Sequence, residues 1–178
     1  MGTKHDKGEI LAAALTVALS DGLSQLTYGR VARHLGIADR TVVYYFRTKD
    51  ELIEAVLVAM GLQIQETLAA AVDEPSHDYM GLLRTAWPVL AHPDVDPLFC
   101  LFFEANGLAA AGRDPYQSLV PTLVEVWISW AAGYVTGSLA ERREEAEAAI
   151  ALLDGLLLLR QLAGIDAAER AARKFGIC

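Results

Sequence analysis

The spacing of apolar residues is the feature that most restricts how this chain can fold. Apolar side chains recur with the 3.6-residue period of an α-helix almost throughout, and the alternating pattern of a β-strand is nearly absent. Hydrophobic residues make up 53% of the sequence, a high share that indicates helices apolar on more than one face. We therefore expect an all-α fold in which these faces pack against one another or against a ligand.

Residues typical of helix ends divide the chain into nine expected helices. Gly22 and Gly36 each follow an apolar segment, and glycine readily adopts the left-handed conformation at a helix C-terminus. Thr48 and Glu51 form a capping-box pattern that predicts a helix start at residue 49. The expected helices cover about residues 7–20, 27–35, 39–45, 49–72, 76–91, 96–110, 114–136, 141–163 and 166–175.

Charge is distributed unevenly along the chain. The net charge is −8, but residues 1–52 hold seven Lys and Arg against six Asp and Glu, while residues 53–178 hold eight against seventeen. The first part therefore carries +1 and the second −9. An acidic chain of this kind is not a nonspecific nucleic-acid binder. The division favours a small N-terminal domain, residues 1–52, that meets phosphates, and a larger C-terminal domain, residues 53–178, that does not.

The chain shows no pattern of catalytic or metal-binding residues. Cys100 lies in an apolar run and Cys178 is the last residue, so their spacing is not typical of a zinc site or a disulfide framework. The first nine residues are polar and charged, and the longest uncharged stretch is shorter than the ~18 residues that suggest a membrane span. We expect a cytoplasmic protein without cofactor, metal or membrane partner, and not an enzyme.

Residues 27–46 predict a helix-turn-helix motif. Val31, Ala32 and Leu35 face inward on the first helix, Gly36 makes the turn, and Val42 completes the small core. A helix fits the major groove of DNA, where its leading side chains reach base edges and phosphates. The outward residues of such a motif are Arg30, Arg33 and His34 on the first helix, and Asp39, Arg40, Thr41, Val43, Tyr44 and Tyr45 on the second.

The segment LTYGRVARHLGIADRTVVYYFRTKDEL, residues 26–52, resembles the DNA-binding domain of the tetracycline-repressor (TetR) family. The resemblance covers about residues 7–58 and is most specific in the Ala-x-x-Leu-Gly-Ile turn, the aromatic run that ends at Phe46, and the lysine before an acidic, leucine-bearing helix. It implies an N-terminal three-helix domain that binds DNA and a C-terminal helical domain that binds an effector and dimerises. It further implies phosphate contacts by Thr27, Thr41, Tyr45 and Lys49, and base-edge or sugar contacts at Gly29, Asp39, Arg40, Val43 and Tyr44.

Three of these positions depart from the family pattern. Ala38 stands where a Ser or Thr cap is frequent, so Asp39 either caps the second helix of the motif or reads a base. Val43 replaces a frequent Tyr and offers a methyl face to thymine, and Gly29 has no side chain with which to read a base. For Lys49 the alternative to a phosphate contact is a local ion pair with Glu51 or Asp50.

Aromatic residues gather on the helices of the C-terminal domain. Trp87, Phe99, Phe103, Trp127 and Trp130 are the candidate effector pocket, although aromatic residues at helical spacing also form ordinary core. Asp154 interrupts an apolar segment and would be costly to bury alone. It either pairs with Arg160 or Arg84, lies at a rim, or contacts a ligand.

These features favour one of three function classes. We expect a homodimer that binds a palindromic operator in double-stranded DNA and is released by a small apolar or aromatic effector. The helices at 114–136 and 141–163 show apolar residues on two faces and are the expected dimer interface. The helix that starts at residue 49 is the expected sole link to the DNA-binding domain. The alternatives are a regulator that responds to a protein partner, and an enzyme or carrier whose motif is incidental.

Overall fold

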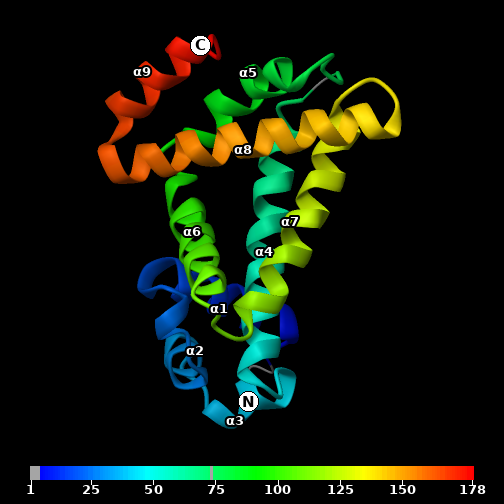
Figure 1. Ribbon diagram of the computed structural model, residues 1–178. Coiled ribbons are helices and arrows are strands. Elements are labelled where there is room, and N and C mark those ends of the chain that lie inside the picture. Colours follow the sequence, from blue (N-terminus) through cyan, green and yellow to red (C-terminus); the bar gives the residue numbers. More distant parts are fainter. Residues whose placement is uncertain (1–4, 73) are drawn as a thin grey trace. The chain divides into compact units, whose positions relative to one another are not determined.

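The computed structural model describes residues 5–72 and 74–178, and within these ranges it is all α-helical, which confirms the expected fold class (Figure 1). The only strand-like pairing there is an isolated bridge between Ser76 and Val135. The elements are α1 (Lys7–Asp21), η1 (Leu23–Gln25), α2 (Tyr28–Leu35), α3 (Asp39–Tyr45), α4 (Lys49–Ala69), α5 (Tyr79–Leu90), α6 (Asp96–Ala110), α7 (Tyr116–Ala131), η2 (Ala132–Tyr134), α8 (Leu139–Ala163) and α9 (Ile165–Phe175), where η1 and η2 are 3-10 helices.

Local capping explains where the helices begin. α3 and α6 have the expected bounds, and α4 starts at residue 49 because the hydroxyl of Thr48 accepts a hydrogen bond from the Glu51 amide at 3.1 Å. The expected start of α5 at residue 76 is wrong. Asp78 caps this helix by accepting from the Gly81 amide at 2.7 Å, while Ser76 pairs its backbone with Tyr134 and Thr136.

The chain divides into two compact units. The first comprises the residues up to Gln63 together with Cys100–Val120, and the second comprises Ile64–Phe99 and Pro121–Cys178. Helices α4, α6 and α7 therefore each contribute residues to both units. The functional division of the chain at residue 52 stays a prediction.

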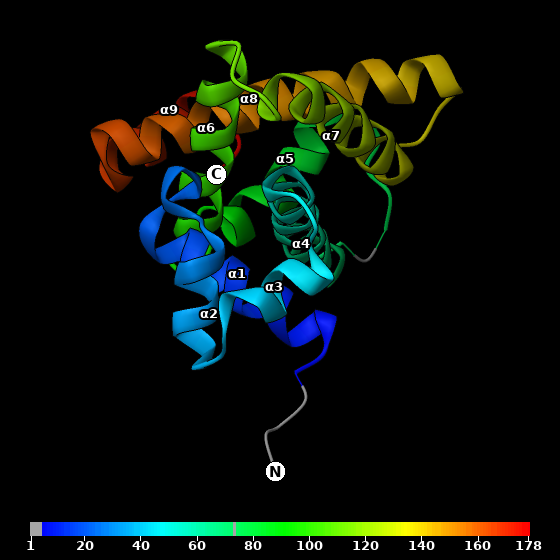
Figure 2. The same cartoon turned by 90° about the horizontal axis from the view of Figure 1, so that it is seen from below.

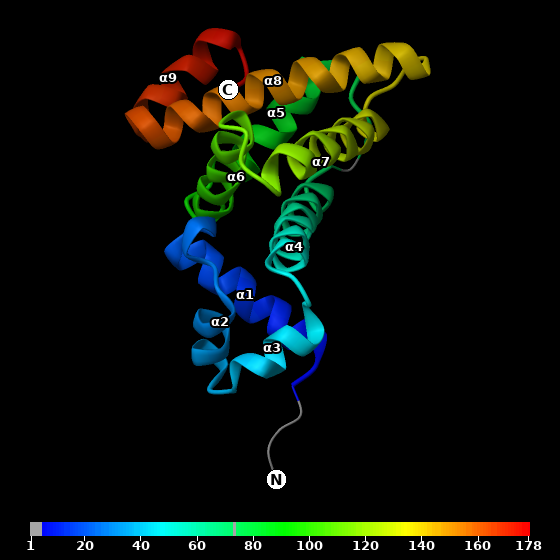
Figure 3. The ribbon, with the colours of Figure 1, turned by 60° about the horizontal axis from the view of Figure 1, so that its bottom comes forward.

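The core of the first unit is built from short helices that pack on longer ones. Figure 3 shows α2 and α3 joined by a tight turn beside α1. The side chains that this packing removes completely or almost completely from solvent are Ile10, Leu23, Leu26, Val31, Val42, Phe46, Leu52, Val56 and Leu57. At about 1.5–3 kcal/mol for each fully buried aliphatic or aromatic side chain, this cluster supplies most of the stabilisation that such short helices need.

Helix α4 is long and apolar enough, by length and composition alone, to cross a membrane. The sequence analysis did not single it out because two glutamates lie within the apolar stretch. Its buried residues include Leu52, Val56, Leu57, Met60 and Ile64. A core helix of a globular protein passes the same test, so this finding is weak evidence for a membrane segment.

The second unit is organised by α8, which packs against both α5 and α9 (Figure 2). A buried ion pair holds α8 to the start of α6. The Arg160 guanidinium, which is 3% exposed, donates to the two carboxylate oxygens of Asp96 at 2.7 and 3.0 Å. Breaking such a pair leaves a buried charge without a partner, which costs several kcal/mol.

Asp154 of α8 has neither of the ion-pair partners that the sequence suggested. Arg160 is engaged by Asp96, and Arg84 donates to the backbone carbonyl of Gly176 at 2.9 Å. Burial among apolar neighbours disfavours the carboxylate and raises the pKa of Asp154 to about 7. Ionisation of Asp154 near neutral pH therefore lowers the free energy of unfolding.

We expect Asp154→Asn to stabilise the protein above pH 7. Because the pKa of Asp154 is raised in the folded state, its contribution is most favourable below the usual Asp pKa of 3.8 and is lost as the pH rises through about 7. The substitution removes the ionisable proton, and its gain at pH 8 is at most roughly 4 kcal/mol, the equivalent of the whole shift. Chemical denaturation between pH 5 and 8 measures the effect. Asp94→Asn, at a side chain that is 89% exposed, is the control, and equal pH dependence in both variants would contradict the assignment.

Candidate nucleic-acid interface

The turn between α2 and α3 has the geometry that a helix-turn-helix requires. Gly36 adopts the left-handed conformation, with φ of 68°, and the amides of Gly36 and Ile37 donate to carbonyls of the last turn of α2. A residue with a side chain is strained at this φ. Glycine at this position therefore ends α2 and sends the chain directly into α3.

The exposed residues of α3 form the surface available to DNA. Tyr44 is 77% exposed and Val43 is 39% exposed, and Arg40 is exposed one turn earlier. Thr41 is half-buried. Lys49, at the start of α4, is also exposed, and its suggested local partner Glu51 instead accepts from the Arg47 amide at 2.8 Å. These positions are compatible with the predicted DNA contacts, which stay predictions.

Asp39 does not cap α3, so that alternative is wrong. The N-cap residue is Ala38, whose backbone is extended and whose side chain can form no capping hydrogen bond. Asp39 is already the first helical residue, and its carboxylate lies close to Gly29 of α2: a Cβ added to Gly29 would be 3.3 Å from the Asp39 Oδ2. A base contact by Asp39 stays a prediction.

The two adjacent tyrosines of α3 have different environments. Their rings meet edge to face, with centroids 5.0 Å apart. The hydroxyl of Tyr45 donates to the backbone carbonyl of His5 at 2.9 Å, so this side chain ties α3 to the segment before α1. Tyr44 makes the larger exposed surface, which agrees with the expectation that at least one of the pair faces outward.

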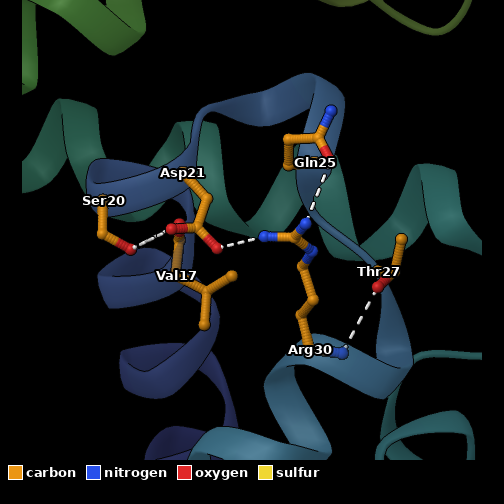
Figure 4. Close-up of polar contacts among 6 residues, drawn as sticks. All are labelled: Val17, Ser20, Asp21, Gln25, Thr27 and Arg30. Carbon is orange, nitrogen blue, oxygen red and sulfur yellow. Dashed lines mark hydrogen bonds and ion pairs between the residues drawn. The ribbon is translucent and has the colours of Figure 1, made fainter.

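Two of the predicted contact residues have structural partners at the start of α2. The Thr27 hydroxyl caps the helix by accepting from the Arg30 amide at 3.3 Å. The same hydroxyl still has its proton to donate, so capping does not prevent a phosphate contact. The guanidinium of Arg30 is bound to the Asp21 carboxylate, and to the Gln25 side chain at 3.1 Å (Figure 4).

Glu104 of α6 makes long-range contacts that the sequence pattern did not predict. Its carboxylate accepts from the Leu23 amide at 2.8 Å, and from the amide and hydroxyl of Ser24 at 3.0 and 2.7 Å. The expectation that α4 is the sole link to the DNA-binding helices is therefore wrong, because α6 contacts the turn before α2. The available signal in the sequence was an acidic residue inside the apolar run of α6. Its partners could not be identified from the sequence because they lie about 80 positions earlier in the chain.

The aromatic residues of the candidate pocket divide between the two units. In the second unit, Trp87 and Phe99 are 2% and 5% exposed and belong to the core. Trp127 and Trp130 of α7 are half-buried, and their ring centroids are 5.6 Å apart. The ring of Trp130 also contacts the ring of Tyr134, with centroids 4.7 Å apart. Phe103 lies in the first unit, beside Phe102. The described contacts thus join Trp127, Trp130 and Tyr134 into one cluster.

Comparison with known proteins agrees with this architecture. Residues 10–56 match the model of the bacterial regulatory proteins of the tetR family. A TetR transcriptional regulator from Legionella pneumophila is 21% identical, with a TM-score of 0.69 over 98% of this chain and 97% of that chain.

Two further solved structures contain small molecules. A putative transcriptional regulator from Saccharomonospora viridis, in complex with choline, is 16% identical, with a TM-score of 0.71 over 94% of this chain and 93% of that chain. The multidrug binding protein EbrR, complexed with proflavin, is 25% identical, with a TM-score of 0.64 over 94% of this chain and 98% of that chain.

A helix-turn-helix with an exposed second helix, joined to a larger helical domain, defines a DNA-binding transcriptional regulator. Residues 10–56 match the TetR family model, and solved regulators share the fold of the chain. This confirms the resemblance that residues 26–52 carry. Regulators of this family are generally DNA-binding proteins and not enzymes.

Two substitutions should separate base contacts from phosphate contacts. Arg40→Ala should weaken binding to a selected DNA site by about 1–3 kcal/mol and relax base preference at one position, because arginine reads base edges. Lys49→Ala should weaken binding to all sequences alike and flatten the salt dependence by about one unit. Fluorescence anisotropy over a salt series measures both effects. Wild-type behaviour of both variants would show that α3 and the start of α4 do not lie against DNA.

Proposed function

We propose that the protein is a homodimeric repressor that binds a palindromic operator and releases it when a small apolar or aromatic effector binds the helical domain. The observation that carries the proposal is the exposed face of α3 in a family-matched helix-turn-helix. In this proposal Thr27, Thr41 and Lys49 meet phosphates, Tyr45 does so by giving up its hydrogen bond to the His5 carbonyl, and Asp39, Arg40, Val43 and Tyr44 lie along the base edges. The first test is selection of binding sites from random DNA, and sites without two inverted half-sites would contradict a palindromic operator.

The proposed dimer interface is an exposed apolar stripe on α8. Ala151, Gly155, Leu158 and Leu162 follow one another at intervals of four, three and four residues, so they lie on one helix face. All four are exposed, with Leu162 at 79%. The small residues at one end allow close approach of a second helix, as a four-helix interface between two copies requires. Ile165 at the start of α9 is 50% exposed and extends the apolar surface.

The apolar residues that face the other way on α8 belong to the core of the same chain. Leu156 and Leu157 are 3% and 1% exposed. These two residues are therefore not available to a second copy. A charge at Leu156 would unfold the domain and would not report on association.

Leu162→Glu should convert the dimer into a monomer. A carboxylate at this position stays solvated in the monomer but would be buried without a partner in the interface. Light scattering over a concentration series measures the mass, and circular dichroism checks the fold. Leu139→Glu is the matched control, since Leu139 is 75% exposed at the opposite end of α8. Dimers of Leu162→Glu as stable as the wild type would place the interface elsewhere.

The half-buried cluster of Trp127, Trp130 and Tyr134 supports an aromatic effector. Such rings offer flat apolar surface for stacking and attract cations to their faces. Proflavin, a planar aromatic cation, is bound in the structure of EbrR, and choline, a quaternary ammonium ion, is bound in the Saccharomonospora viridis regulator. Both compounds are therefore suitable first probes. A regulator that responds only to a protein partner would bind neither of them.

Titration with proflavin or choline should quench tryptophan fluorescence, and Trp127→Ala should weaken the binding at least about tenfold, equivalent to the ~1.4 kcal/mol that one stacked ring contributes. Operator affinity without ligand should stay within about twofold of the wild type.

A probe that binds and switches must weaken operator binding by the same factor by which the operator weakens probe binding. Because proflavin also stacks in DNA, this last step uses choline or another compound that leaves free DNA unchanged. Binding without any effect on operator affinity would contradict effector-driven release.

A further inference from the structure

The turn between α1 and α2 is held by polar side chains from two directions. We call this turn the joint and define it as residues 21–25, which include the last residue of α1 and all of η1. One direction is α6, through Glu104, and the other is α2, through Arg30. All of these residues lie within the first compact unit. The joint is therefore a side-chain connection between α6 and the DNA-binding helices.

The Glu104 carboxylate takes the place of a helix cap at the start of η1. Each of its two oxygens accepts from one of two consecutive amides, those of Leu23 and Ser24. Such amides have no partner inside a helix, and a carboxylate is their strongest acceptor. Gly22 has a φ of 88°, and a Cβ added there would lie only 3.0 Å from the Glu104 Oε2. Glycine thus provides both the backbone conformation and the room for the carboxylate.

Arg30 closes the other side of the joint. Its guanidinium reaches Asp21 at the end of α1 and Gln25 at the end of η1, so one side chain spans the joint from end to end (Figure 4). The planar fork of arginine is needed for this pair of contacts, because an ammonium group has no second donor arm. The hydroxyl of Ser20 and the guanidinium of Arg30 lower the pKa of Asp21, so the carboxylate stays ionised at neutral pH.

Helix α6 connects this joint to the effector-binding domain. Asp96, its first residue, is held by the buried Arg160 of α8 in the second unit. Glu104 follows eight residues later in the sequence and belongs to the first unit. Each end of this helical segment thus has a carboxylate fixed to a different part of the chain.

We propose that the joint couples α6 to α2, and that Glu104 and Arg30 are positioning residues that set the orientation of the helix-turn-helix. The inference rests on the proposed function, because DNA binding is the activity that it modulates. It assigns Arg30 a role different from the DNA contact that the sequence predicts. When α6 shifts, the carboxylate of Glu104 moves with it, and the joint must either follow or lose its amide contacts.

The test measures operator affinity against salt concentration for Arg30→Gln, Arg30→Lys, Asp21→Asn and Glu104→Gln. We expect each variant to bind the operator roughly three- to thirtyfold more weakly, as loss of one charge-assisted contact gives. The slope of log affinity against log salt should not change, because no phosphate contact is lost. Arg30→Lys keeps the charge but loses the fork, so it should behave like Arg30→Gln. Arg170→Gln, at an exposed position of α9 outside the helix-turn-helix, is the charge-matched control.

Double variants test whether the residues act as one unit. Arg30→Gln combined with Asp21→Asn should bind no more weakly than Arg30→Gln alone, because Arg30→Gln already removes the contact with Asp21. Full affinity of Arg30→Lys together with a slope reduced by about 0.9 in Arg30→Gln would show that Arg30 contacts phosphate and would overturn its assignment. Affinity within twofold of the wild type for both Glu104→Gln and Asp21→Asn would overturn the coupling.

Hydrogen exchange on the protein alone keeps the inference separate from the proposed function. Glu104→Gln preserves the shape of the side chain but turns one acceptor into an NH2 donor that faces an amide. Exchange should rise at the amides of Leu23 and Ser24 and also at those of α2, with α5 unchanged. A rise confined to Leu23 and Ser24 would show that the joint does not couple to α2. If the wild type selects no DNA site, the proposed function fails, but this measurement still decides the coupling.

Discussion

The DNA-binding surface depends on the burial of a few side chains from helices that are too short to be stable alone. α2 and α3 have eight and seven residues, well below the roughly 12–15 residues at which an isolated helix becomes even marginally stable in water. Val31, Val42 and Phe46 are at most 1% exposed, and α2 packs against both α1 and α3. The exposed residues of α3 are free for DNA because the buried ones carry the stability.

This constraint explains why polar contacts surround the small core. The packing of three residues leaves the orientation of two short helices sensitive to small changes, so directional hydrogen bonds at their ends have a large effect. Tyr45 fixes the end of α3 to His5, and Thr27 caps the start of α2. Arg30 and Glu104 fix the turn before α2. Residues on the outer face of the motif, which are natural candidates for DNA contacts, can therefore have the structural role of fixing the helices that carry the DNA-binding surface.

Local features of the fold could be predicted from the sequence, and long-range pairs could not. The bounds of α3 and the start of α4 follow from signals within a few residues, such as the glycine at 36 and the cap at Thr48. The Arg160–Asp96 pair and the Glu104 contacts join residues 64 to 81 positions apart, and periodicity carries no information about such pairs. Helical spacing placed Arg30 on an outward face correctly, but it did not reveal that Asp21 lies within reach.

The uneven charge of the chain makes DNA binding more dependent on these contacts. The region after residue 52 carries −9 in the sequence, so DNA is repelled from it and binding relies on the small cationic surface of the first domain. A surface with so few positive groups makes few phosphate contacts, so each lost contact removes a large share of the free energy of DNA binding. Nonspecific attraction therefore cannot compensate for a wrong orientation of α2 and α3. In the proposed mechanism, small displacements of α2 and α3 are therefore expected to change the affinity for the operator. The contacts of Glu104 and Arg30 with the joint are where such a displacement would act.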